Sequence, residues 1–378
     1  MKAKMEREAL LSGVSRTLGV VDRRGTMVIL SHFLFSAEAG DQVAIAATDL
    51  EVSFRGVYPA RVEEPGALTL PAQQFHNLIK ELPGTELALS TTDDSRLSVS
   101  VGESRYQFVG LPADQFPPVP EAPDQPLVEV ESRLLREMIS KTLFSVADDN
   151  YLYPSTNCIF LERAKGANAP GLRLVSTDGH RLTVIERPLP QSEQFHIEEG
   201  ILIPRKGVAA ISGLLAEEEQ VGLGLSEKSL ALKADHKYLF IRLLEKKFPD
   251  YRRIIPKSFA YRFAIKRQTL HDIIRRISLL STGRSRGILL KLTEGQLEVT
   301  FDNPGVGNGR ELMPLFLKKG DPAGLPITIG FNARYLLEPL RAMHGDTVYL
   351  EINDKDQPCR LMAQDDPNYF GIIMPMSL

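Results

Sequence analysis

The sequence predicts an α+β protein of three tandem domains of similar size, each with two helices on antiparallel sheets of about eight short strands. The chain has 378 residues, more than one hydrophobic core usually serves. A strand-like run that ends in Asp occurs three times, as Val43–Asp49, Leu172–Asp178 and Leu297–Asp302. The three aspartates lie 129 and 124 positions apart, and this nearly constant interval indicates an internal repeat.

Each copy of the repeat is expected to open with an amphipathic helix. The clearest is Gln268–Ser281, which has four apolar residues at helical spacing. Ser132–Ser145 carries a similar apolar stripe, and Ser132 is suited to the N-cap position. The third such helix, Glu6–Val21, has the weakest pattern because two glycines interrupt it.

A short strand and a second helix follow in each copy, before a series of alternating strands that closes with proline. The second helices are predicted over Phe75–Leu82, Val208–Leu215 and Tyr335–Met343. The breaks between copies are expected near Glu121–Gln125, which is rich in Pro and Asp, and near Pro256–Ser258. We therefore expect domains at 1–125, 126–257 and 258–378.

The composition and the termini exclude several classes of protein. Cys158 and Cys359 lie far apart without ligand spacing, so we expect buried, reduced thiols and neither a disulfide framework nor a metal site. The N-terminus is charged and unlike a signal peptide, and no run reaches the ~20 apolar residues of a membrane span. We expect a cytoplasmic protein with no cofactor and no membrane contact.

A net charge of −3 conceals an uneven distribution of charge. The six predicted helices with their flanking residues carry a net charge of +10, so the rest of the chain carries −13. If the helices share one surface, that surface attracts phosphate without reading base sequence, because phosphates carry no sequence information. Ordinary solvated helix faces are the alternative for any single helix. The sequence shows no zinc-finger or base-stacking pattern.

No phosphate-binding glycine loop, metalloprotease motif or nucleophile elbow occurs in the sequence. One stretch, Thr177-Asp178-Gly179-His180-Arg181-Leu182, places a carboxylate and an imidazole two positions apart after a strand. A hydrolase built on Asp178 and His180 is therefore one hypothesis. Because Asp-Gly is turn chemistry and the other two copies lack the His, we favour a turn that carries a local binding feature.

The chain ends in an apolar, Met-rich tail, Ile372-Ile373-Met374-Pro375-Met376-Ser377-Leu378. Chain termini are usually polar and frayed, and Met side chains adapt to varied partners. A last core strand explains part of this tail. The functional interpretation is a hydrophobic groove beside the tail that accepts short partner peptides.

Through essentially its whole length the chain resembles the bacterial beta sliding clamp family, the processivity subunit of the replicative DNA polymerase. The resemblance lies in seven segments that occur in order at the spacing of the family. They are Arg24–Leu30, Ala47–Glu51, Leu111–Pro117, Ser176–Leu182, Phe248–Arg253, Phe331–Leu336 and Met374–Met376.

The resemblance implies a DNA clamp fold that closes, as a head-to-tail homodimer, into a six-domain ring around double-stranded DNA. It implies a DNA contact by Arg24. Further candidate contacts are the basic residues of the other predicted helices, namely Lys80, Arg133, Arg136, Lys141, Arg205, Lys206, Arg275 and Arg276. It also implies a dimer contact between the first and third domains, at Tyr106, Phe108, Leu279 and Leu280.

The resemblance further implies a groove between the second and third domains that binds a short linear motif. The motif belongs to the polymerase catalytic subunit, the clamp loader and repair polymerases. The matching groove residues are Thr177, Gly179, His180, Arg181, Leu182, Pro249, Arg253, Ile254, Ile373, Met374, Pro375 and Met376. The chain departs from the family at Tyr153–Asn157, Ser285 and Ser377. An open, monomeric DNA-binding protein is the remaining alternative to a clamp.

Overall fold

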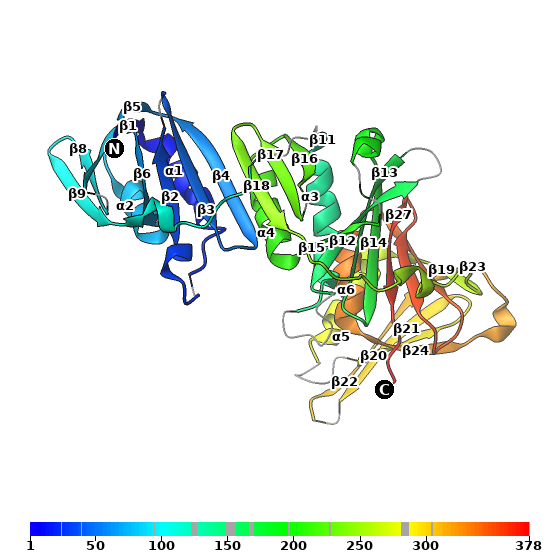
Figure 1. Ribbon diagram of the computed structural model, residues 1–378. Coiled ribbons are helices and arrows are strands. Elements are labelled where there is room, and N and C mark those ends of the chain that lie inside the picture. Colours follow the sequence, from blue (N-terminus) through cyan, green and yellow to red (C-terminus); the bar gives the residue numbers. More distant parts are fainter. Residues whose placement is uncertain are drawn as a thin grey trace. The chain divides into compact units, whose positions relative to one another are not determined.

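The computed structural model describes residues 1–23, 25–38, 40–93, 95–121, 127–148, 156–165, 170–195, 197, 199–226, 228–280, 287–303 and 305–377 (Figure 1). These residues form two compact units. The first unit comprises Met1–Leu135, Gln194–His196 and Lys206–Leu243, and the second comprises Arg136–Glu193, Ile197–Arg205 and Leu244–Leu378. The middle third of the chain therefore contributes strands to both units.

The first unit holds a five-stranded sheet with the order β5-β1-β7-β8-β9. The bounds of its strands are β1 Lys2–Glu6, β5 Arg61–Glu64, β7 Glu86–Asp93, β8 Arg96–Val101 and β9 Ser104–Val109. Every pairing in this sheet is antiparallel. Strand β9 lies at one edge of this sheet.

The same unit holds a nine-stranded sheet with the order β10-β6-β2-β3-β4-β18-β17-β16-β11. Its strands are β2 His32–Ala37, β3 Gln42–Thr48, β4 Val52–Pro59, β6 Gly66–Pro71, β10 Leu111–Pro112, β11 Val128–Glu131, β16 Gln220–Ser226, β17 Ser229–Ala234 and β18 Lys237–Arg242. Strands β4 and β18 lie side by side, with Phe54 opposite Leu239 (Figure 1). This pairing joins the first third of the chain to the middle third in one sheet.

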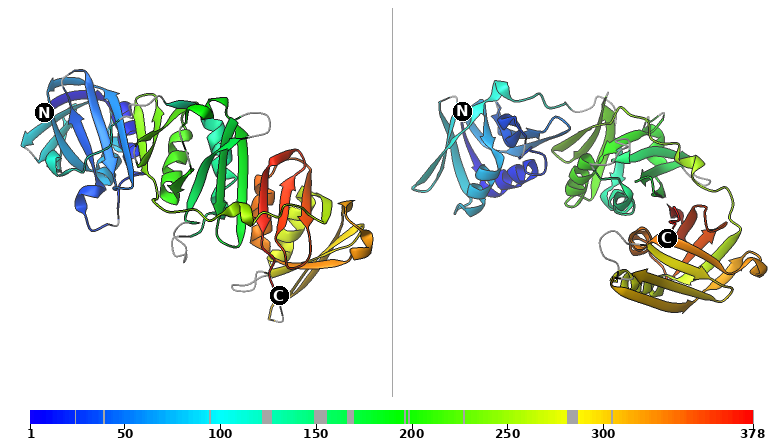
Figure 2. Two further views of the ribbon diagram at one scale, coloured as in Figure 1. Left: turned by 45° about the vertical axis from the view of Figure 1, so that its right-hand side comes forward. Right: turned by 90° about the horizontal axis from the view of Figure 1, so that it is seen from below.

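The second unit holds the other nine-stranded sheet, with the order β15-β12-β13-β14-β27-β26-β25-β19-β23. Its strands are β12 Cys158–Lys165, β13 Pro170–Thr177, β14 Arg181–Pro188, β15 Ile201–Pro204, β19 Tyr261–Lys266, β23 Phe316–Lys319, β25 Thr347–Ile352, β26 Cys359–Ala363 and β27 Asp366–Ile373. Figure 2 shows β27, in red, beside the green strands of the middle third. Arg181 lies opposite Ile373 and Ile185 opposite Tyr369, so this pairing joins the middle third to the last third.

A four-stranded sheet completes the second unit, with the order β22-β21-β20-β24. Its strands are β20 Gly287–Leu292, β21 Gln296–Asn303, β22 Gly307–Pro314 and β24 Ile327–Asn332. Strands β22 and β24 are its two edges.

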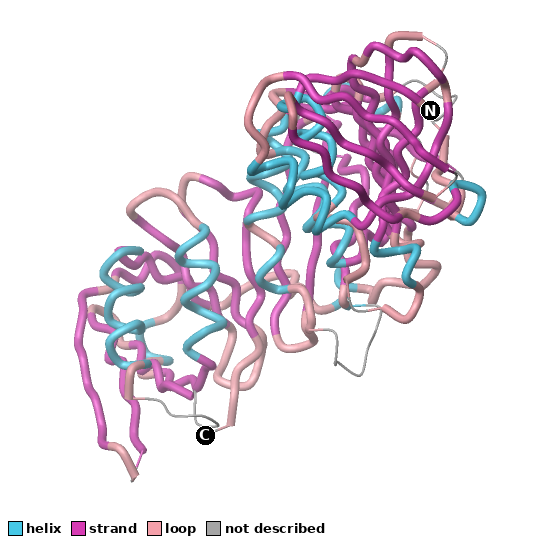
Figure 3. The backbone as a smooth tube through the Cα atoms, turned by 90° about the vertical axis from the view of Figure 1, so that its left-hand side faces the viewer, coloured by secondary structure: helices cyan, strands magenta, loops and turns pink. Residues whose placement is uncertain are grey.

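Six α-helices lie in the described residues, two in each third of the chain, as the repeat predicts. They are α1 Arg7–Thr17, α2 Ala72–Glu81, α3 Ser132–Ser140, α4 Arg205–Leu215, α5 Arg267–Ser278 and α6 Ala333–Ala342. Within each unit the helices form a layer against the strands (Figure 3). Helices α1 and α2 pack together, and so do α5 and α6.

Helix α3 differs from its prediction at both ends. Ser132 is its first helical residue and not an N-cap, and the buried Ser132 hydroxyl has no hydrogen-bond partner among the described residues. The helix ends at Ser140, five residues earlier than predicted, and a short 3-10 turn at Leu143–Ser145 follows. The apolar spacing continues through this turn, which is why periodicity alone extends the helix too far.

The repeated aspartates have the structural role that the sequence analysis favours. Asp49 Oδ1 accepts the backbone N–H groups of Glu51 and Val52, at 2.9 and 2.7 Å, and Asp178 Oδ1 accepts those of His180 and Arg181, both at 3.1 Å. The threonine before each aspartate accepts the second N–H beyond it in both copies. Leu50 and Gly179 follow with φ of 74° and 81°. The first two copies therefore end the repeated strand in the same turn, and the third copy uses Asn303 instead.

The interior of both units is apolar, and it includes both cysteines as free, buried thiols. Burial raises the pKa of Cys158 and Cys359 to about 12, so both remain unreactive thiols. None of the helices in the described part of the chain is long and apolar enough to cross a membrane. The same part of the chain has no cluster of three or more His, Cys, Asp or Glu side chains able to hold a metal ion.

Candidate functional site

The turn after β13 carries Asp178 and His180, the two residues of the hydrolase hypothesis. The hydrogen bonds of Asp178 stabilise this turn. The Asp178 carboxylate accepts two backbone N–H groups through Oδ1, and Arg181 Nε donates to its Oδ2 at 2.9 Å. The imidazole Nδ1 of His180 lies 3.3 Å from the backbone oxygen of Asp178. Gly179 adopts the left-handed conformation, which a residue with a side chain adopts only with strain. The segment is therefore built as a tight turn that leaves His180 exposed.

Arg181 fastens this turn to helix α6 of the last third of the chain. Its side chain is 4% exposed and pairs with Asp178 and with Glu338, a residue of α6. It also donates to the backbone oxygen of Phe144, and its guanidinium lies 4.7 Å from the ring centre of Tyr335. A buried guanidinium needs this number of partners, because an unpaired charge in the interior is costly. Arg181 therefore holds the turn in position through contacts on the buried side of the turn.

The predicted groove residues of the turn and of the C-terminal strand come together in the structure. Leu182 and Ile373 are buried, on the neighbouring strands β14 and β27. Beyond β27 the chain stays beside the turn, because the Met374 N–H donates to the His180 oxygen at 2.9 Å. Met374 and Met376 are 36% and 38% exposed, so the tail that leaves the turn carries two apolar residues accessible to solvent.

Residues 243–260, which connect β18 and β19, supply the remaining predicted groove residues, and we call them the connecting segment. This segment packs close to strands β14 and β27. Phe248 and Tyr251 belong to the same buried cluster as Leu182 and Ile372. Pro249 is half-buried within this segment, whereas Arg253 and Ile254 are exposed. Of the predicted groove residues, Thr177, Arg181, Leu182 and Ile373 are buried, while Gly179, His180, Arg253, Ile254, Met374 and Met376 are exposed.

A buried ionic cluster beneath the connecting segment escapes prediction from the sequence. Glu162 accepts hydrogen bonds from the Tyr251 hydroxyl at 2.5 Å, from Arg173 at 2.8 Å and from Arg252 at 2.6 Å. Burial raises the pKa of Tyr251 to about 12, and the Glu162 carboxylate adds to this effect. Burial opposes ionisation of Glu162, yet its three donors keep its pKa below the usual value. These residues lie up to 90 positions apart, so only the fold reveals that they form one cluster.

The predicted DNA contacts divide into accessible and inaccessible residues. Lys80, Arg133, Arg136 and Arg275 are exposed and form no ion pair with another described residue. Arg205, Lys206 and Arg276 are accessible but paired, with Asp148, Asp49 and Glu311 respectively. Arg24 lies outside the described residues. The observed helices carry twelve basic and five acidic residues, so the basic excess persists within their shorter bounds.

Lys141 requires a correction, because the structure places it in the interior. Its side chain is 4% exposed, and its ammonium donates to Glu137 at 2.8 Å and to Asp366 at 3.1 Å. Helix α3 ends one residue before Lys141, so this residue does not share the exposed helical face of Arg133 and Arg136. Lys141 is therefore not available to DNA phosphates.

The four predicted dimer residues lie at sheet edges or beside them. Tyr106 and Phe108 belong to the edge strand β9, where Tyr106 is exposed and Phe108 packs edge-on against Phe75. Leu279 follows the last residue of helix α5 and is 77% exposed, and Leu280 is half-buried. An edge strand with apolar side chains offers unpaired backbone groups to another chain.

Comparison with known proteins gives the same result for every third of the chain. The DNA polymerase III beta subunit family matches with its N-terminal domain at residues 1–120, its central domain at 129–250 and its C-terminal domain at 252–377. Beta sliding clamps of Pseudomonas putida and Caulobacter vibrioides are 33% and 31% identical, over 100% of both chains.

Solved structures agree with these matches. A beta sliding clamp of Caulobacter crescentus superposes with a TM-score of 0.93 at 29% identity, and the DNA polymerase III subunit beta of Pseudomonas aeruginosa with 0.90 at 30% identity, each over 100% of both chains. Three of these four relatives are named as beta sliding clamps, and the fourth as a subunit of DNA polymerase III. On the full-length matches, the chain belongs to the bacterial beta sliding clamp family, the beta subunits of DNA polymerase III.

Proposed function

We propose that two copies of this chain close head to tail into a six-domain ring around duplex DNA, and that the ring tethers a replicative polymerase. The observation that carries the proposal is the unbroken succession of three DNA polymerase III beta domains along the chain. It supports the domain boundaries 1–125, 126–257 and 258–378, which fall close to the ends of the three matches. The ring would confer processivity by topology, without a catalytic step.

Dimer formation would use the edges that the fold leaves unpaired. Strand β9 ends the five-stranded sheet and β22 ends the four-stranded sheet. Tyr106 and Phe108 lie on β9, while Leu280 lies against Gly309 of β22 and Leu279 is exposed nearby in sequence. Because a head-to-tail contact joins two different surfaces, a dimer closes only when the contact is made twice.

The DNA contacts would come from the basic helices and would be independent of base sequence. Lys80, Arg133, Arg136 and Arg275 are the accessible cations for this role, and Arg205, Lys206 and Arg276 would exchange their acidic partners for phosphate. Arg24 is retained as a proposed contact on the family resemblance. Equivalent phosphates along the duplex allow the ring to slide, because no position is preferred.

Partner proteins would bind beside the C-terminal tail through a short linear motif. The exposed Met374, Met376 and Ile254 support an apolar groove at this place, with His180 at its rim and the buried Arg181 holding the turn. Clamps of Bartonella birtlesii and Pseudomonas aeruginosa have been solved with griselimycin, a peptide-like ligand. The partners would be the polymerase catalytic subunit, the clamp loader and repair polymerases.

Three departures from the family bear on peptide preference in this groove. Of the stretch Tyr153–Asn157, residues 153–155 lie outside the described residues, as does Ser285, whereas Thr156 is described and buried and Ser377 is described and exposed. Serine at the penultimate position lacks the charge of a basic side chain, so we expect weaker selection for acidic partner peptides. We propose a cytoplasmic protein that associates with the nucleoid while it is loaded on DNA.

A comparison of circular and linear DNA tests the clamp. The full-length protein is loaded on a nicked plasmid with a clamp loader and ATP, and the complex is washed in about 1 M salt. A closed ring survives the wash and leaves when the plasmid is linearised, because retention is topological. An open DNA-binding monomer would leave in salt on both templates, since only phosphate contacts hold it. Salt-sensitive retention on the circle would overturn the proposal.

A further inference from the structure

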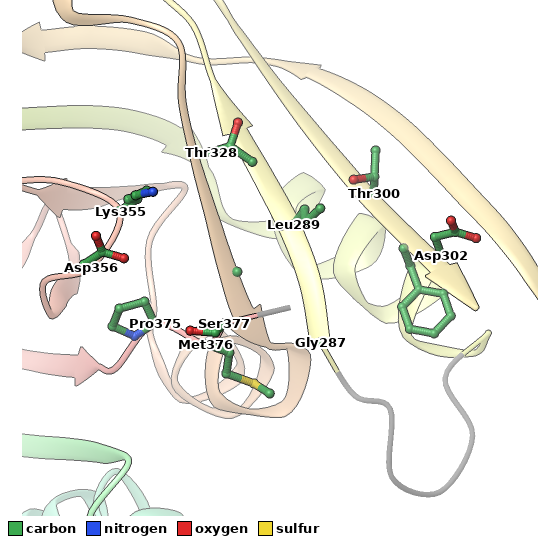
Figure 4. Close-up of a pocket in the computed structure, with 12 residues that line it drawn as sticks. Gly287, Leu289, Thr300, Asp302, Thr328, Lys355, Asp356, Pro375, Met376 and Ser377 are labelled. Atoms are coloured by element: carbon green, nitrogen blue, oxygen red, sulfur yellow. The ribbon is translucent and has the colours of Figure 1, made fainter. Parts of the chain in front are cut away.

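A hollow of about 970 Å³ lies beside the C-terminal tail, on the outer face of the four-stranded sheet (Figure 4). We call it the tail hollow and define it by Leu289, Thr300, Thr328, Gly330, Lys355 and Met376. Its volume is near the upper end of the ~300–1,000 Å³ usual for ligand sites. None of its defining residues except Met376 belongs to the predicted groove.

The floor of the tail hollow follows from the strand register. Leu289 on β20 lies opposite Gly330 of β24 on one side and opposite Thr300 of β21 on the other. Because Gly330 has no side chain, one flank of Leu289 stays uncovered, and Leu289 is 37% exposed. The floor is therefore one partly exposed leucine bordered by two small threonines, Thr300 and Thr328 (Figure 4).

The tail connects this hollow to the predicted groove. The Met374 N–H donates to His180 in the turn that borders the groove, and two residues later the Met376 N–H donates to the Gly330 oxygen at 2.8 Å. Pro375 and Met376 line the tail hollow and also belong to the groove set. A peptide that leaves the groove over the tail therefore enters the hollow directly.

Strand β24 offers backbone hydrogen bonds along this path. It is the terminal strand of its sheet, and the described part of the tail bonds to its outer edge at Gly330, where the Met376 N–H donates. In an antiparallel strand every second residue directs its backbone groups to the same edge. Thr328, two residues before Gly330, thus presents its N–H and C=O to the outer edge, where an extended segment can pair with it.

We infer that the tail hollow is a second subsite for partner proteins, occupied by the extended segment that adjoins the groove-binding motif. The segment pairs with the edge of β24 at Thr328 and packs an apolar or small side chain on Leu289. One cation, Lys355, and two carboxylates, Asp302 and Asp356, line the hollow, so acidic side chains in this segment are disfavoured. This inference rests on the proposed groove. It means that the four-stranded sheet contributes part of the affinity and specificity for partner proteins.

Peptide binding to the full-length protein tests the inference. The probes are a fluorescein-labelled dodecapeptide, selected from a random display library against the wild-type protein, and its shortest binding core. Leu289→Arg and Thr328→Arg place a bulky cation in the hollow at exposed positions, where the fold tolerates the change. Gln296→Arg is the matched control, on the same face of β21 and about 13 Å along the strand from Thr300, at ~3.3 Å per residue.

We expect the dodecapeptide to bind wild type and Gln296→Arg about tenfold more tightly than its core does. In Leu289→Arg and Thr328→Arg this advantage disappears, while the affinity of the core stays within about twofold of wild type. Equal affinity of the dodecapeptide for wild type and both hollow variants overturns the inference but leaves the groove intact. Core binding that survives Met374→Lys contradicts the groove itself. A change in the mass of unliganded Leu289→Arg in sedimentation would assign the surface to a contact between copies, and it too overturns the inference.

Discussion

Four charged side chains, Glu137, Lys141, Arg187 and Asp366, form a cluster that links the middle third of the chain to its last strand. Substitution of one of them should measure how much the cluster stabilises this link. The Lys141 ammonium donates to Glu137 and to Asp366, and Arg187 donates to the same two carboxylates through Nη2, at 2.6 Å each. Lys141 Nζ also lies 4.8 Å from the ring centre of Tyr369. Asp366 begins β27, so the cluster fastens the first residue of that strand beside β14.

Asp366→Asn removes two of the four cation–carboxylate pairs and leaves two cations against the single charge of Glu137. Breaking a fully buried pair costs about 3–5 kcal/mol, and an exposed pair is worth less than about 1 kcal/mol. The side chains of Lys141, Arg187 and Asp366 are 4%, 14% and 23% exposed, so we expect a loss of about 2–3 kcal/mol. Adding Lys141→Met removes the most buried cation, and we expect it to restore about half of this loss.

Hydrogen exchange measures this loss locally, which matters because a chain with two units need not unfold in one step. The amide of Val184, opposite Phe370, reports on the β14–β27 pairing, because every second residue of β14 directs its N–H to β27. Glu311→Gln is the control, since its partner Arg276 is 57% exposed and the pair should contribute less than about 1 kcal/mol. Equal effects of Asp366→Asn and Glu311→Gln on the exchange free energy would refute the reasoning.

The same cluster predicts that the pairing of β14 with β27 loses stability at low pH. Burial alone would raise the pKa of Glu137, but hydrogen bonds from Arg187 and Lys141 outweigh burial and lower the pKa from 4.5 to about 2. The pKa of Asp366 is also lowered, by the same donors against the effect of burial. Because the folded pKa lies below the unfolded one, the stabilisation is complete above about pH 4.5 and is lost as the pH falls towards 2. The difference in denaturation midpoint between wild type and Asp366→Asn should therefore shrink over that range.

Three further predictions address the proposed ring and groove. Leu279→Glu places a charge on a side chain that is 77% exposed, and we expect monomers in sedimentation velocity; an unchanged dimer mass would contradict the interface. Arg275→Ala should weaken binding to duplex DNA equally for all sequences and reduce the salt slope by about one phosphate contact, and an unaltered slope would exclude the contact. His180→Ala should weaken binding of a groove peptide by about tenfold without affecting dimer mass, whereas loss of hydrolysis of any small ester in the variant would revive the hydrolase hypothesis.

The sequence predicts the repeated units because local chemistry defines them. Asp49 and Asp178 each follow a strand-like run, and a threonine precedes each, so the same turn closes both. Positive φ at Gly179 is foreseeable from the residue type, but positive φ at Leu50 is not. The leucine adopts this conformation because Thr48 and Asp49 bind the surrounding N–H groups, which is information that lies in the neighbouring residues.

Lys141 and Arg181 show where sequence analysis reaches its limit. Helical periodicity assigns Lys141 to an exposed face, but the helix ends at Ser140, and the partner Asp366 lies 225 positions away. Arg181 belongs to the predicted binding turn, yet its partner Glu338 lies on α6, 157 positions further along the chain. In both cases the basic residue is held by a carboxylate of the last third of the chain, and such distant pairs leave no local pattern.

These distant pairs explain why the proposed groove lies where it does. Strand β27 is hydrogen-bonded to β14 on one side and to β26 on the other, so it belongs to the middle and the last thirds of the chain together. The cluster of Lys141 and Arg187 fixes its first residue, and Arg181 fixes the turn opposite its last residue. A short tail that emerges from a strand held at both ends can expose apolar side chains without fraying. In the proposed groove, Met374 and Met376 would therefore meet partners from a strand held at both ends, and this arrangement would lower the entropy lost on binding.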